Sequence, residues 1–154
     1  MRKILSMLLM LQPAALFAHG YGFGDLVVAH PIVFETPQTA QTGAGYLTIF
    51  NNGATDDVLI AVKADFPRVT LHQTIMQGDI ASMADIDGIP VPALKVTTLE
   101  PGGAHVMFMG LAGDPFEVGE EIKATLVFAE AGEIDVVFRV EARSDDKPVD
   151  HSNH

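Results

Sequence analysis

The segment Glu121–Ala142, EIKATLVFAEAGEIDVVFRVEA, decides the fold class of this chain. It contains two β-rich apolar runs, Glu121–Glu130 and Glu133–Ala142, joined around Ala131 and Gly132. Short runs of this kind, bounded by turn residues, are typical of strands, and no stretch from residue 25 onward has the apolar period of a long helix. We therefore expect two strong strands at this end of the domain.

The rest of the chain repeats the pattern. Seven further strands are expected at Leu26–Phe34, Gly45–Phe50, Val58–Ala64, Val69–Met76, Ile89–Lys95, Val96–Leu99 and His105–Leu111. Pro31 suggests an edge or a bend in the first of them, and Asn51-Asn52-Gly53 is a hairpin turn signal. About eight or nine short strands without a helix predict an all-β fold, an antiparallel β-sandwich or barrel.

The two ends of the sequence differ from this body. Residues 1–18 combine Arg2 and Lys3 with a short apolar run and small residues before Ala18. This pattern predicts a cleaved secretory signal peptide, because the run is too short to span a bilayer. Residues 19–143 are then the folded domain of an exported protein, beginning at His19, and the polar residues 144–154 are an expected disordered tail.

Composition excludes several classes of function. The formal charge is −11, and without residues 1–18 the chain keeps 7 basic and 20 acidic residues, or −13. Such a surface repels nucleic acid and anionic lipid. The absence of cysteine excludes disulfides, zinc–thiolate sites and a blue-copper centre. It suits an oxidising compartment, where methionine is a soft ligand that cannot cross-link.

Two imidazoles and two thioethers stand out within Val69–Met109. Ten residues separate His72 from Met83, twenty-one separate Met83 from His105, and one separates His105 from Met107. Thioether sulfur suits Cu(I), and imidazole binds copper in either oxidation state. His105 and Met107 point off the same face of their strand. On its own strand, His72 points to the face that Leu71 does not occupy. The four residues are therefore a candidate Cu(I) site.

The neighbours of these residues have more ordinary interpretations. Met83 lies in a loop-like stretch, QGDIASMAD. Asp79, Asp85 and Asp87 surround it and are expected to be solvated loop charges that could also attract a cation. We expect Met76 and Met109, the other two sulfurs of this region, to belong to the core or to surround the site. His30, before Pro31, is expected to be structural.

The spacing His72-X10-Met83-X21-His105-X-Met107 resembles the signature of the periplasmic copper chaperones called PCu(A)C. LEPGGAHVMFMGL at 99–111 and AHP at 29–31 are also similar to that family, although Leu71 stands where the family often has methionine. The resemblance implies a cupredoxin-like β-sandwich in which these four residues bind Cu(I). It also implies delivery in the periplasm to the copper centres of cytochrome c oxidase, through its copper-bearing subunit and alongside a Sco-type protein.

Other functions stay open at this point. Four neutral ligands leave no open position for substrate, which favours a carrier over an enzyme. A copper oxidase built on an N-terminal His brace at His19, or a Cu(II)-binding protein, is the alternative, and a metal-free β-sandwich binding module is the third. His151 and His154 could bind a second, weaker Cu(II), together with His19. We expect neither nucleic-acid binding nor stable membrane insertion.

Overall fold

The computed structural model describes residues 20–143, which form eleven strands. The strands are β1 (Gly20–Phe23), β2 (Leu26–Phe34), β3 (Thr42–Asn51), β4 (Asp57–Ala64), β5 (Arg68–Gln77), β6 (Ile80–Asp85), β7 (Ile89–Val91), β8 (Lys95–Leu99), β9 (Ala104–Met109), β10 (Glu121–Phe128) and β11 (Gly132–Glu141). The described part of the chain contains no helix that is long and apolar enough to cross a membrane. The all-β prediction is confirmed, but β1 and β6 were not among the expected strands.

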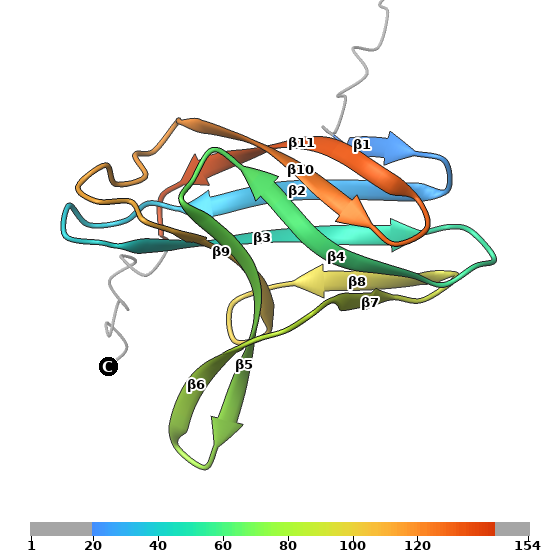
Figure 1. Ribbon diagram of the computed structural model, residues 1–154, viewed down its shortest axis with the longest axis horizontal. Helices are drawn as coiled ribbons and strands as arrows, with labels where there is room; N and C mark the ends of the chain where they lie inside the picture. Colours follow the sequence, from blue (N-terminus) through green and yellow to red (C-terminus); the bar gives the residue numbers. More distant parts are fainter. Residues whose placement is uncertain (1–19, 144–154) are drawn as a thin grey trace, which may run out of the picture.

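The strands pair in the order β6-β5-β9-β3-β2-β11-β10-β4-β7, with β1 added to β2 and β8 added to β3. Contacts of β4 with β5 and of β7 with β8 bring distant parts of this order together. Figure 1 shows the resulting sandwich, from which the β5–β6 hairpin projects alone. The pairing of β2 with β11 is parallel, so the predicted antiparallel arrangement needs one correction: the sheet is mixed.

The core consists of phenylalanine and aliphatic side chains, and the chain contains no tryptophan. Phe108 lies at its centre, with ring centroids 5.2 Å from Phe66, 5.9 Å from Phe116 and 5.6 Å from Phe138. The edge-to-face arrangements among these rings are ones that aromatic quadrupoles favour. Phe108 belongs to β9, so the strand that carries His105 and Met107 is fixed by the core on its other face.

Two turn predictions had different outcomes. Pro31 does mark a bend, because the pairing of β2 with β3 shifts between Ala29 and Ile32 and His30 adopts a φ of 52°. Asn51-Asn52-Gly53 does not form a hairpin, since β3 and β4 are not paired with each other. The buried Asn51 amide instead donates hydrogen bonds to the carbonyls of Thr55 and Val91, and this tertiary role replaces the local turn.

Candidate metal centre

Strand register places the four candidate ligands on one face of the β6-β5-β9 segment. His72 on β5 is directly opposite His105 on β9, and Thr70, two residues earlier, is opposite Met107. On the other side of β5, Thr74 is opposite Met83 of β6. Directly opposed residues share a face of a sheet, as do residues two apart on one strand. Chain segments far apart in sequence therefore present their imidazoles and thioethers on the same side.

The two imidazoles form the centre of this arrangement. The ring centroids of His72 and His105 are 5.7 Å apart, and the rings are tilted by 55°. Both residues are buried, with His105 only 2% exposed. The Nδ1 atom of His105 lies 3.2 Å from the carbonyl oxygen of Gly103. Donation to this carbonyl places the ring proton on Nδ1 and leaves the Nε2 lone pair free for a metal.

Three ring nitrogens at this centre have no hydrogen-bond partner among residues 20–143: both nitrogens of His72 and Nε2 of His105. The Asp85 carboxylate is close, with Oδ1 at 2.6 Å from Nε2 of His72, but this approach does not have hydrogen-bond geometry. Buried polar atoms without partners are rare and costly in folded proteins. A soft cation bound by one nitrogen of each ring would satisfy two of these atoms, so the donor set fits copper.

The protonation of His105 also suits metal binding. Burial lowers the pKa of its imidazole below the ordinary value of 6.5, the Gly103 carbonyl partly opposes this shift, and the neighbouring His72 adds a smaller lowering. Since only the neutral ring can bind a metal, this environment keeps His105 in its ligand form at neutral pH.

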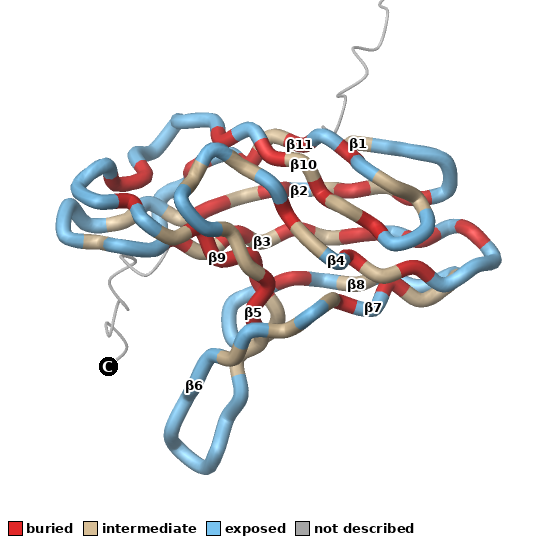
Figure 2. The backbone as a smooth tube through the Cα atoms, in the orientation of Figure 1, coloured by how far each residue is buried: buried red, intermediate tan, exposed pale blue. Residues whose placement is uncertain are grey.

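The two thioethers lie in different surroundings. Met107 is buried but is not part of the core cluster that contains its neighbours Val106 and Phe108. Met83 is 60% exposed and belongs to strand β6, so its expected position in a loop is wrong. Figure 2 shows the projecting hairpin as almost wholly exposed, whereas β9 and the adjoining part of β5 are largely buried. The face thus combines three buried donors with one exposed donor.

Two residues that sequence reasoning did not assign to the site also approach it. Asp85 was expected to be a solvated loop charge, but it is the register partner of His72, and Arg68 contacts its Oδ2 at 2.8 Å. Tyr46 of β3 has its ring centroid 6.4 Å from that of His105, and burial raises the pKa of its hydroxyl despite the opposing charge of Arg143. The contact of Asp85 with His72 could have been predicted from a turn at Gly78-Asp79. Such a turn aligns Gln77 with Ile80, and hence His72 with Asp85. The sequence carries no comparable signal for Tyr46.

The remaining predicted residues lie elsewhere. Met76 is 60% exposed on the hairpin, so it is not a core residue. Met109 is half-buried at the opposite end of the face, where it pairs with Arg68 and Thr42. His30 is exposed at the bend of β2. The candidate secondary ligands His19, His151 and His154, like the predicted signal peptide and tail, lie outside the described residues.

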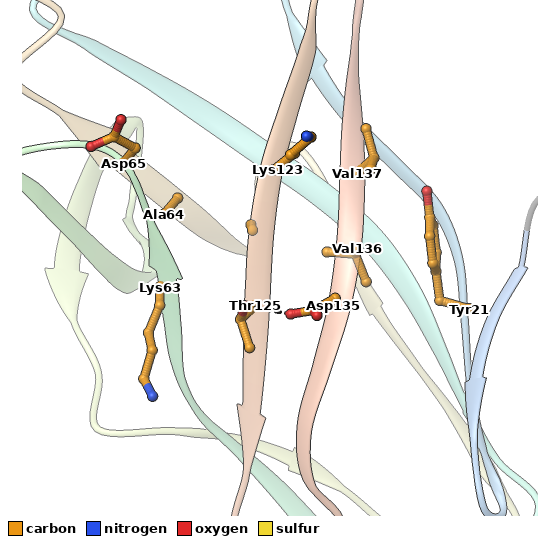
Figure 3. A pocket seen from close by; sticks show the side chains of 10 residues that line it. Tyr21, Lys63, Ala64, Asp65, Lys123, Thr125, Asp135, Val136 and Val137 are labelled. Carbon is orange, nitrogen blue, oxygen red and sulfur yellow. Dashed lines mark hydrogen bonds between the residues drawn. The ribbon is translucent and has the colours of Figure 1, made fainter.

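Other parts of the described chain do not offer a rival site for a metal. Within residues 20–143, no group of three or more His, Cys, Asp or Glu side chains is arranged to hold an ion. A surface hollow of about 550 Å³ lies over β4, β10 and β11 (Figure 3), where Lys63, Lys123, Asp65 and Asp135 line it. Its charges are mixed, Thr125 donates a hydrogen bond to Asp135 there, and it contains no soft donor.

Comparison with known proteins shows the family of the chain. Residues 26–140 match the family described as "Putative lipoprotein LpqE-like". A "Putative lipoprotein Lxx21020" from Leifsonia xyli subsp. xyli is 30% identical over 89 residues, which are 56% of this chain. This match spans only 53% of that relative's length.

Solved structures resemble the domain over most of its length. The copper-bound PCuAC domain from PmoF2 has a TM-score of 0.69 at 31% identity and covers 81% of this chain and 99% of its own. The apo PCuAC domain from PmoF1 has a TM-score of 0.68 at 32% identity, with 81% and 100% covered. Apo-DR1885 from Deinococcus radiodurans shares the fold, with a TM-score of 0.60 at 24% identity, and covers 96% of this chain and 98% of its own. The predicted family resemblance is thus confirmed, and the chain belongs to the LpqE-like family of PCuAC proteins.

Proposed function

We propose that this protein is a copper chaperone that binds one Cu(I) with His72, Met83, His105 and Met107. The observation that carries the proposal is the buried, register-paired His72 and His105, of which both nitrogens of His72 and Nε2 of His105 lack a hydrogen-bond partner among residues 20–143. Met107 and Met83 lie on the same face. Copper in the similar PmoF2 domain supports the choice of metal.

The donor chemistry favours a carrier. All four ligands are neutral, so the bound site keeps the single positive charge of the ion, and thioethers favour Cu(I) over Cu(II). Four filled positions leave none open for a substrate, unlike a catalytic metal site. Exposed Met83 can leave the ion first, which would let a recipient replace the ligands one at a time.

We further propose that the protein works in the periplasm and delivers Cu(I) to the copper centres of cytochrome c oxidase, alongside a Sco-type protein. The signal-like residues 1–18 and the lipoprotein descriptions of the family and of the Leifsonia relative support export. The recipient follows from the family resemblance, and copper transfer to the isolated copper-bearing subunit is the measurement that tests it.

X-ray absorption of the reduced, copper-loaded protein tests the site directly. We expect one copper per chain with two nitrogen and two sulfur neighbours. A variant with Met83→Ala and Met107→Ala should lose the sulfur neighbours and bind Cu(I) far more weakly. If that double variant bound Cu(I) as tightly as the wild type, the proposed ligand set would be wrong.

A further inference from the structure

The β5–β6 hairpin carries a second thioether on the same face as the proposed ligands. Gln77 pairs with Ile80 across a two-residue turn whose first residue, Gly78, has a φ of 64°. This turn sets the register, in which Met76 is opposite Ala81 and Met83 is two residues further along β6. Such diagonal neighbours have Cα atoms about 7–8 Å apart, within reach of long side chains. Met76 and Met83 can therefore approach each other outside the buried site.

The hairpin separates its apolar side chains by type. Met76 and Met83 lie on the ligand face, and each is 60% exposed. Ile75 is opposite Ser82, and Ile80 is opposite Gln77, so both isoleucines lie on the other face. A general requirement for apolar side chains in the hairpin does not explain why both methionines, and neither isoleucine, lie on the face that carries His72. Neither methionine is a core residue, which removes the usual explanation for methionine in a strand.

We propose that Met76 and Met83 form an outer two-sulfur site through which Cu(I) enters and leaves the buried site of His72, His105 and Met107. This inference rests on the proposed copper function and adds Met76 as a transfer ligand. Met83 belongs to both sites, so the ion need not be released into water between them. On entry, the Cu–S bond to Met76 breaks as a Cu–N bond to a histidine forms. Because every ligand is neutral, copper stays Cu(I) and no proton or electron moves.

The rate of copper transfer separates this role from equilibrium binding. The Cu(I)-loaded full chain is mixed with the chelator bicinchoninate in a stopped-flow instrument. Met76→Leu keeps the volume and apolarity of the side chain but removes its sulfur. We expect it to slow transfer about tenfold and to leave the equilibrium Cu(I) affinity within about twofold of the wild type. Met109→Leu, which removes a sulfur from the far end of the same face, should change neither quantity.

A titration with Ag(I), a redox-inert analogue of Cu(I), gives a second readout. Methyl NMR spectra of methionine-labelled protein should show the Met107 and Met83 signals shifting with the first equivalent. With excess Ag(I) the Met76 signal should shift, and the Met83 signal should shift again because the two sites share it. An unchanged transfer rate in Met76→Leu, or a Met76 signal that never moves, would overturn the inference. Failure of the wild type to bind Cu(I) in equilibrium dialysis would instead overturn the proposed copper function, so the two failures are distinguishable.

Discussion

The two ends of strand β5 lie in opposite environments. At its base, Leu71 faces the core, and His72 is buried against His105 of β9. At its tip, Ile75 and Met76 are exposed, and within residues 20–143 the only strand paired there is the equally exposed β6. One continuous strand thus belongs to the packed sandwich at one end and to a free hairpin at the other.

This difference assigns different tasks to the two halves of the proposed site. The buried donors are held by strands that the core orders, so their geometry exists before the ion arrives. Preorganisation of this kind reduces the ordering cost of binding. The hairpin has little packing to hold it, and regions with few buried contacts open most easily. Affinity should therefore depend mainly on the base of β5 and on β9, and exchange should depend mainly on the hairpin.

Removing a buried ligand should have the largest effect. We expect His105→Ala to weaken Cu(I) binding by at least about 1,000-fold, or ~4 kcal/mol. The exposed Met83→Ala should cost far less, about tenfold, because water or Met76 can approach the vacated position. Competition with a chromophoric Cu(I) chelator measures both constants. Equal losses of Cu(I) affinity in the two variants would show that buried and exposed ligands contribute equally to binding, contrary to this expectation.

Stability should show the same division along β5. Leu71→Ala opens a cavity beneath the site and should lower the free energy of unfolding by about 2–5 kcal/mol. Ile75→Ala, on the same strand but 42% exposed, should change it by less than about 0.5 kcal/mol. Urea denaturation of the two apo variants measures the difference. A large loss in Ile75→Ala would show that the hairpin tip is packed against the rest of the protein.

The sequence predicted the buried donors of the site better than the exposed β5–β6 hairpin. The alternation around His105 and Met107 is a local pattern, and it indicated correctly that the two side chains share a face. The stretch around Met83 contains Gly, Asp and Ala, which strands disfavour, so the sequence favours a loop there. Pairing with β5 overrides this propensity and forms β6.

Long-range pairing was the least predictable part of the fold. The parallel contact of β2 with β11 joins Val33 to Val140, and neither run carries a local signal for its partner. Asn51 is similar, since its amide reaches the carbonyl of Val91, 40 residues away. The contact of Asp85 with His72 required only the register of one hairpin, so it was within reach of sequence reasoning once the turn was recognised.

Asp85 connects the two halves, because it lies on β6 but contacts buried His72. We expect Asp85→Asn to weaken Cu(I) binding about tenfold, the lower end of what partners of metal ligands contribute. The reason is that the charged carboxylate, itself paired with Arg68, has Oδ1 2.6 Å from Nε2 of His72 and so places a negative charge beside the bound cation. Asp79→Asn, on the same hairpin, is the matched control with the same change of charge. The expectation is wrong if the two variants have equal affinities.

The smallest expected effect concerns pH and the buried half alone. Burial lowers the pKa of His105 below 6.5, so at acidic pH the unfolded chain takes up this proton more readily than the folded one. The stability that neutral His105 contributes is therefore complete above about pH 6.5 and is lost as the pH falls through that value towards the lower folded pKa. Melting temperatures of the apo protein between pH 8 and pH 5 should fall more steeply for the wild type than for His105→Gln, which does not titrate. If the melting temperatures of the two proteins fell equally with pH, the imidazole of His105 would not be shielded from solvent, and the contrast between the buried site and the exposed hairpin would not hold.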